Sequence, residues 1–252
     1  VAPDSEPASV RDGAGLIDTM RISAQGDRRR TGPVSGVVAV ATGRATAGAT
    51  ALRATSPSVA RVFVAGDVSW ESRFLVATLE EAGWPVDVAV SLSPRVMIRQ
   101  GAARVPTRSR HSIVIALPVA SSAVLASLPQ FARDGGGVVL VGDVARRSSL
   151  AGLRAGAPGE TVSGEAGAES GPDPRHGLDL VPITSLARDA VRLESRDGLT
   201  AIAARRVGAG RMLPVGYENS WLWRMAGNDD APNAHRRWWT AMLSGLVPLR
   251  AP

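Results

Sequence analysis

The fold of this chain is decided between residues 61 and 90, which read RVFVAGDVSWESRFLVATLEEAGWPVDVAV. The apolar run 62–65 predicts a short buried strand that ends at Gly66 and Asp67. Ser69 can cap a helix that ends near Gly83, because apolar residues recur between them at helical spacing. Residues 86–90 then predict a second strand, so the stretch indicates a right-handed strand–helix–strand unit.

The same alternation continues downstream. Residues 113–117 are an unbroken apolar run, as expected for a strand that is covered on both faces of a parallel sheet. Residues 121–133 predict a helix that is interrupted or restarted near Pro129, and residues 138–141 predict the next strand. The expected fold class is therefore α/β: a flavodoxin-like three-layer sandwich with a mostly parallel central sheet.

The remaining segments complete this picture. A basic loop is expected at 93–110, and strands at 178–183 and 191–193. Residues 200–206 and 211–215 predict a hairpin, and an aromatic helix is expected at 235–246.

Two domains are expected. Residues 1–59 predict an extended tail, to about residue 12, and a small β-rich N-terminal arm, because their start is rich in Pro, Ser, Asp and Glu and β-branched residues follow. Residues 60–252 form the α/β domain, with a flexible loop at about 152–177 that is rich in Gly, Ala, Pro, Ser and Glu.

The charge balance bounds the partners. The formal net charge is +6, the sequence pI is about 11.2, and every basic side chain other than histidine is arginine. Such a balance suits acidic partners, anionic lipid headgroups or nucleic acid. The arginines are scattered, which argues against nucleic acid.

The chain contains no cysteine, which excludes disulfides, thiolate metal sites and thiol catalysis. The sequence begins at Val1 rather than Met, which fits a removed signal segment, a longer N-terminal region or a trimmed chain. Together these features favour an extracytoplasmic (periplasmic) location, peripheral to the membrane.

Three segments carry a family resemblance: VFVAGDVSWESRFL at 62–75, GGGVVLVG at 135–142 and RVGAGRMLPVG at 206–216, the last continuing into SWLWR at 220–224 and HRRWW at 235–239. Together they resemble the class I glutamine amidotransferase-like domain. More narrowly, they resemble the degenerate variety found in bacterial membrane-associated proteins that carry von Willebrand type A domains. The resemblance covers about residues 60–247, and it implies a flavodoxin-like fold and an extracytoplasmic setting.

The sequence departs from this family at the nucleophile. The resemblance places a cysteine in the turn after strand 138–141, and that turn reads Gly142-Asp143-Val144-Ala145. The expected histidine–glutamate pair is also missing, because His176 and His235 lack it and His111 precedes the turn. Gly142 and Asp143 therefore mark a degenerate elbow, and the sequence predicts no catalytic residue and no enzymatic activity.

Two other classes of function stay open. One is a hydrolase or transferase with a non-cysteine nucleophile between Asp143 and Ser149, although the Gly-x-Ser-x-Gly elbow is absent. The other is a sensory module that binds a small anion or a sugar at the strand ends around Gly66 and Gly142. Three separated histidines offer no metal-ligand set, and no cofactor is expected.

Tryptophan and arginine cluster in a few segments, which is typical of a packed core or of an interface. Two tryptophans adjacent on a helix point about 100° apart, and Trp221 and Trp223 would face opposite sides of an extended strand. One of each pair is therefore a candidate for exposure. The candidate interface comprises Trp70, Arg73, Trp221, Trp223, Arg224, Arg236, Arg237, Trp238 and Trp239.

These observations predict a pseudoenzyme with a structural role. The expected function is a non-catalytic, membrane-extrinsic accessory or scaffold subunit that docks to, and stabilises, integral membrane proteins of a larger bacterial complex. A photosynthetic reaction centre with its antenna would be one instance.

Overall fold

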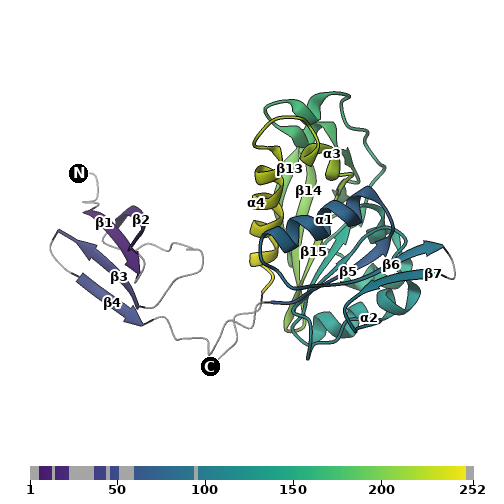
Figure 1. Ribbon diagram of the computed structural model, residues 1–252, viewed down its shortest axis with the longest axis horizontal. Coiled ribbons are helices and arrows are strands. Elements are labelled where there is room, and N and C mark those ends of the chain that lie inside the picture. The colour runs from purple at the N-terminus through teal and green to yellow at the C-terminus, as the bar shows by residue number, and fades with distance from the viewer. Residues whose placement is uncertain are drawn as a thin grey trace. The chain divides into compact units, whose positions relative to one another are not determined.

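The computed structural model describes residues 6–12, 15–22, 37–43, 46–50, 60–93 and 96–247. The chain divides into two compact units, residues 1–58 and 59–252, which we describe separately (Figure 1).

The N-terminal unit contains an antiparallel sheet of four strands in the order β2-β1-β3-β4. Its strands are β1 (Glu6–Asp12), β2 (Gly15–Ile22), β3 (Val37–Thr42) and β4 (Thr46–Thr50). β1 falls in the segment expected to be an extended tail, yet it pairs with a strand on each side. Ala8 and Val10 alternate with more exposed residues and are buried, which explains why this polar-looking segment is a strand.

The C-terminal unit is built on a sheet of eight strands, in the order β13-β14-β15-β9-β8-β5-β6-β7. Five neighbouring strands are parallel: β15 (Gly210–Val215), β9 (Gly137–Val141), β8 (Ile113–Ala116), β5 (Val62–Asp67) and β6 (Val86–Ser93). The strands at the two edges are antiparallel: β14 (Leu199–Val207), β13 (Ala190–Arg196) and β7 (Val96–Gln100). The expected α/β fold with a mostly parallel sheet is confirmed.

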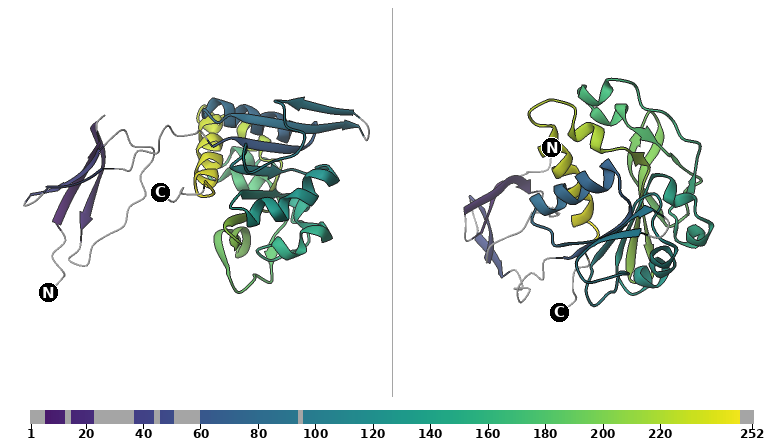
Figure 2. Two further views of the ribbon diagram at one scale, coloured as in Figure 1. Left: turned by 90° about the horizontal axis from the view of Figure 1, so that it is seen from below. Right: turned by 45° about the vertical axis from the view of Figure 1, so that its right-hand side comes forward.

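Helices cover both faces of this sheet (Figures 1 and 2). On one face lie α1 (Trp70–Glu81), α3 (Trp221–Arg224) and α4 (Ala231–Ser244); on the other lie α2 (Ser122–Arg133) and the 3-10 helices η1 (Gly142–Arg146) and η2 (Ser148–Leu153). The side chains of β5 alternate between the two faces of the sheet. Val62 and Val64 belong to the core on the α1 face, and Phe63 and Ala65 belong to the core on the α2 face. The unbroken apolar runs in the sequence follow from this double coverage.

The predicted start of α1 is confirmed, and the predicted break in α2 is wrong. Ser72 N–H donates to Ser69 Oγ at 3.3 Å, and Ser69 N–H donates to Ser72 Oγ at 3.1 Å, which makes a capping box. α2 continues through Pro129, although a proline removes one helical hydrogen bond. The buried side chains of Leu125, Leu128 and Phe131 hold the helix against the sheet and offset that loss.

Other elements differ from the prediction in detail. The predicted strand 178–183 is split into β11 (Asp179–Leu180) and β12 (Ile183–Thr184), with Pro182, which has no N–H, between them. Part of the expected basic loop forms β7, antiparallel to β6. The last helix starts earlier than predicted, with a proline in its first turn.

Short elements lie between η2 and β13, and one more follows β15. They are β10 (Ala157–Pro158), η3 (Ala168–Ser170), η4 (Pro174–Gly177) and β16 (Tyr217–Glu218); β10 pairs with β12, and β11 pairs with β16. The flexibility predicted for residues 152–177 stays a prediction. Across the part of the chain that the structure describes, no helix is both long enough and apolar enough to cross a membrane.

Candidate functional site

The turn after β9 is filled by a glutamate. Gly142 has φ +57°, and a Cβ atom at this position would overlap the side chain of Glu218. The backbone N–H of Asp143 donates to Glu218 Oε1 at 2.9 Å, across 75 residues of sequence. The hollow beside Gly142 and Ala145 has a volume of about 10 Å³, which is no more than one water needs. The predicted elbow is therefore closed.

The Glu218 carboxyl group of this closed elbow has a shifted pKa. Burial raises the pKa of Glu218, the hydrogen bond from Asp143 N–H opposes this effect, and the charges of Asp143 and Asp179 raise it further. Asp143 itself is exposed. Ser148 and Ser149 are also exposed, and no histidine in the described ranges hydrogen-bonds to either of them. A serine–histidine nucleophile is thus not assembled here.

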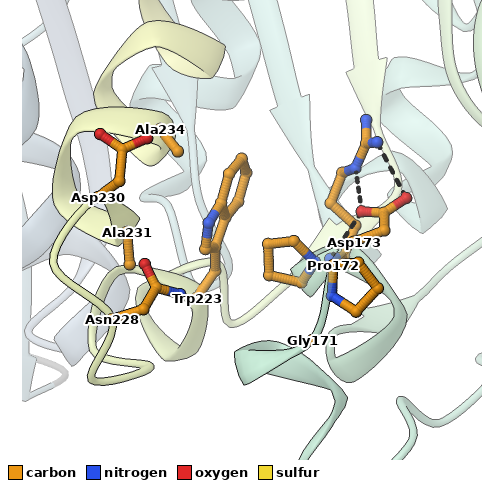
Figure 3. A pocket seen from close by; sticks show the side chains of 10 residues that line it. Gly171, Pro172, Asp173, Trp223, Asn228, Asp230, Ala231 and Ala234 are labelled. Atoms are coloured by element: carbon orange, nitrogen blue, oxygen red, sulfur yellow. Dashed lines mark hydrogen bonds and ion pairs between the residues drawn. The ribbon is translucent and has the colours of Figure 1, made fainter.

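A larger pocket opens beside α3. It has a volume of about 440 Å³, within the usual range for small-molecule sites. In Figure 3 the indole of Trp223 stands between Asp230 and Ala234 on one side and Pro172 on the other. The wall is formed by Gly171, Pro172, Asp173, Pro174, Arg175, Trp223, Asn228, Asp230, Ala231 and Ala234.

The charged groups of this pocket are held in fixed states by arginines. Arg175 donates to both oxygens of Asp173, at 2.7 and 3.0 Å. Burial would raise the pKa of Asp173, but the hydrogen bonds and charge of Arg175 outweigh it and hold that pKa below its ordinary range. A hydrogen bond from Arg237, at 2.7 Å, lowers the pKa of Asp230. Both carboxylates are therefore ionised near neutral pH and act as acceptors, not as proton donors.

A chain of buried polar side chains lies behind Trp223. Ser220 Oγ donates to Glu71 Oε1 at 2.6 Å and lies 2.9 Å from His235 Nε2, and His235 Nδ1 lies 3.2 Å from Thr78 Oγ1. The Trp223 indole packs edge-on against the His235 ring, with 5.7 Å between ring centroids. These contacts join α1, α3 and α4 and support one wall of the pocket.

The same chain cannot act as a nucleophile, because Ser220 is 2% exposed and His235 is fully buried. Burial lowers the pKa of His235 to about 3, and the nearby charge of Arg224 lowers it further. Burial raises the pKa of Glu71. This chain is therefore a structural support rather than a reaction centre.

The predicted tryptophan–arginine interface divides into an exposed part and a core part. Trp70 is 53% exposed, with the Arg73 guanidinium 5.4 Å from its ring and the Trp221 ring 6.2 Å away. Trp223 and Trp239 are buried, and Trp238 is half-buried against both. Contrary to the extended conformation that we considered, Trp221 and Trp223 lie on the short helix α3.

Three of the four arginines of that predicted interface pair with carboxylates of the same chain. Arg224 donates to Glu81 at 2.7 Å, Arg236 lies 3.4 Å from the same residue, and Arg237 pairs with Asp230 at 2.7 Å. Because these charges are already compensated, the structure assigns them a packing role. Their use as an interface stays a prediction.

Gly66, at the end of β5, allows the backbone to pack closely against Leu117. A Cβ atom at Gly66 would lie 2.7 Å from Leu117 Cβ, and the capping box described above already uses the Ser69 and Ser72 amides. An anion site at this turn therefore has no support from the geometry. Within the described residues, no group of three or more His, Asp or Glu side chains could hold a metal ion.

Comparison with known proteins supports the fold and names no family. No family model matches the chain, and no curated protein is similar enough to count as a relative. An exo-β-1,4-mannosidase from Opitutaceae bacterium strain TAV5 is similar in structure, with a TM-score of 0.50, 16% identity, and coverage of 73% of this chain and 36% of that one.

Two further solved structures are similar to this chain, with TM-scores of 0.50 and 0.45. A cytoplasmic protein of Salmonella typhimurium LT2 has a TM-score of 0.50 and 9% identity, with coverage of 74% of this chain and 99% of that one. A GH42 β-galactosidase from G. stearothermophilus has a TM-score of 0.45 and 16% identity, with coverage of 75% and 31%. The chain spans about a third of the length of the glycoside hydrolases that it matches.

These findings correct two expectations. The assignment to the amidotransferase-like family is wrong, because no family model matches and an exo-β-1,4-mannosidase is among the proteins of similar structure. The expectation of a non-catalytic scaffold subunit, and so of no enzyme, is also wrong, because that similarity favours the hydrolase alternative. It rested on the missing thiol, whereas enzymes that cleave glycosidic bonds work with carboxyl groups. Nothing in the comparisons points to photosynthesis.

Proposed function

We propose that this chain recognises a saccharide in the pocket beside α3. The observation that carries the proposal is the pocket itself: a hollow of about 440 Å³ in which two ionised carboxylates, an amide and an arginine surround a tryptophan. Sugar hydroxyls need both acceptors and donors, which Asp173, Asp230, Asn228 and Arg175 supply. Pro172 and Pro174 offer apolar surface to the C–H groups of a sugar ring, and the Trp223 indole, which is 7% exposed, lies behind that surface.

The fixed charge states favour binding over chemistry in this pocket. Because arginines keep Asp173 and Asp230 ionised, neither group can protonate a leaving oxygen. The same arginines hold both carboxylates in place, so they need little ordering when a ligand arrives. Among proteins of similar fold, one is named as an exo-β-1,4-mannosidase, which is in keeping with a sugar ligand.

The test is a calorimetric titration of the full chain with galactose, mannose, cellobiose and β-1,4-mannobiose. At least one sugar should bind, and Asp230→Asn and Asn228→Ala should each weaken binding about tenfold, because each removes a polar contact with the ligand. Asp229→Asn is the matched control, since Asp229 is exposed, adjacent and outside the pocket wall. If no sugar binds, or if Asp229→Asn weakens binding equally, the proposal fails.

A second candidate, hydrolysis of a glycosidic bond, is favoured by the carboxyl pair at the closed elbow. The raised pKa of Glu218 suits a general acid, and the charge of Asp143 suits a base or nucleophile. Catalysis there requires the Glu218 side chain to leave the turn that it fills. Release of nitrophenol from aryl β-glycosides should fall at least about a hundredfold in both Glu218→Gln and Asp143→Asn. Undiminished release in either variant would exclude this pair.

A further inference from the structure

The β6–β7 hairpin exposes an unusual group of apolar side chains. Leu92, Val96, Met97 and Ile98 are 58%, 48%, 41% and 47% exposed, and every residue of β7 is exposed. In Figure 1 and the left view of Figure 2, β6 and β7 extend beyond the rest of the C-terminal unit. A monomeric domain rarely leaves four large apolar side chains together in water without a use for them.

These side chains lie on both faces of the hairpin. Met97 pairs with Ser91 and Ile98 pairs with Val90, so Met97 points to one face while Val96 and Ile98 point to the other. A protein surface laid on one face would leave the other in water, and a second copy paired along the β7 edge would cover neither. A lipid surface encloses a projecting tip from both sides.

One uncompensated cation adjoins the apolar side chains. Arg99 follows Ile98 on β7, is exposed, and within the described residues its side chain forms no hydrogen bond or ion pair. Arg104 is also exposed, but it lies beyond Gln100, which pairs with Val88 at the base of the hairpin. Gln100 Nε2 donates to Glu80 Oε1 at 2.6 Å, so a carboxylate lies at that base and not at the tip. The charge next to the apolar side chains is therefore positive.

The opposite edge of the same sheet offers a matched comparison. On β13, Val191 and Leu193 are 60% and 57% exposed. The carboxylates beside them are paired, Asp189 with Arg205 and Glu194 with Arg175. That edge therefore differs from the hairpin in having two large exposed apolar side chains instead of four.

We propose that the β6–β7 tip docks on an anionic lipid bilayer, with Leu92, Val96, Met97 and Ile98 entering the headgroup–acyl boundary. Arg99 is adjacent to Ile98 and can reach lipid phosphates while the apolar side chains are immersed. An arginine near such a surface strengthens binding about fivefold, and salt weakens this contribution. The proposal does not depend on the saccharide site.

The test is sedimentation of the full chain with vesicles. The wild type should bind vesicles of equimolar phosphatidylcholine and phosphatidylglycerol, and bind phosphatidylcholine alone about fivefold more weakly. The double variant Met97→Asp/Ile98→Asp should lose binding to both, and Arg99→Gln should lose only the preference for anionic vesicles. These side chains are exposed, so the circular dichroism and melting temperature should be unchanged.

The matched control is Val191→Asp/Leu193→Asp, which makes the same change at the other sheet edge and should bind as the wild type does. Equal loss in this control, or no binding of the wild type to anionic vesicles, overturns the proposal. Sedimentation velocity without lipid tests whether a second copy of the chain covers the hairpin instead. A dimer that the Met97→Asp/Ile98→Asp variant abolishes would show that a second copy covers the hairpin, and would overturn the proposal as well.

Discussion

Residues 218–228 contribute both to the elbow after β9 and to the pocket beside α3, but they close the elbow and line the pocket. Glu218 fills the turn at Gly142 and leaves about 10 Å³. The continuation, from Trp223 to Asn228, lines a hollow of about 440 Å³. The missing cysteine therefore describes the closed region only. The loss of the nucleophile at the end of β9 therefore does not exclude a ligand site in the pocket that Trp223 and Asn228 line.

Glycine substitutions at the two regions should separate them most strongly. Gly142 and Gly227 both have positive φ, +57° and +82°, but only Gly142 has a side chain against its Cβ position. Gly142→Ala should lower the free energy of unfolding by about 3 kcal/mol, from backbone strain plus overlap with Glu218, and Gly227→Ala by about 1 kcal/mol, from strain alone. Urea unfolding measures both.

A companion variant sharpens that comparison. Adding Glu218→Ala to Gly142→Ala removes the overlap, so it should recover part of the lost stability. Equal losses for the two single variants would mean that the elbow is not tightly filled.

The contribution of His235, behind the pocket, to the stability of the fold should decrease in acid. Because burial lowers the folded-state pKa of His235 to about 3, its contribution to stability is complete above its ordinary pKa of 6.5 and is lost as pH falls toward 3. The loss is about 1.4 kcal/mol per pH unit. His235→Gln lacks this titration, so the stability advantage of the wild type should shrink at that rate from pH 6 to pH 4. A constant difference across this range would show that His235 is not buried as a neutral ring.

Glu218→Gln should give the smallest effect, with the opposite sign. Burial raises the folded-state pKa of Glu218, so its contribution is present below its ordinary pKa and is lost as pH rises through the folded value. The variant should therefore gain stability relative to the wild type between pH 4 and pH 7, which urea unfolding at the two pH values measures. Glu165→Gln, which removes an exposed carboxyl group, is the control substitution.

Local signals predicted the framework, and long-range contacts set the rest. Ser69 and Gly83 mark the two ends of α1 in the sequence and in the structure. β7 was missed because Arg99 and Gln100 gave it a basic, loop-like composition. The filling of the elbow by Glu218 and the meeting of Asp173 with Trp223 and Asp230 are contacts across long stretches of chain, and no local pattern encodes them.

The position of β9 in the sheet has a consequence for how the chain is made. Gly137 of β9 lies between Ile113 of β8 and Arg211 of β15, so one edge of β9 stays open until residues 210–215 leave the ribosome. That edge is flanked by Val138 and Val139, buried on opposite faces in the finished sheet, and open apolar edges pair readily with other chains. β15 therefore covers an edge of β9 that would otherwise be open to pairing with other chains.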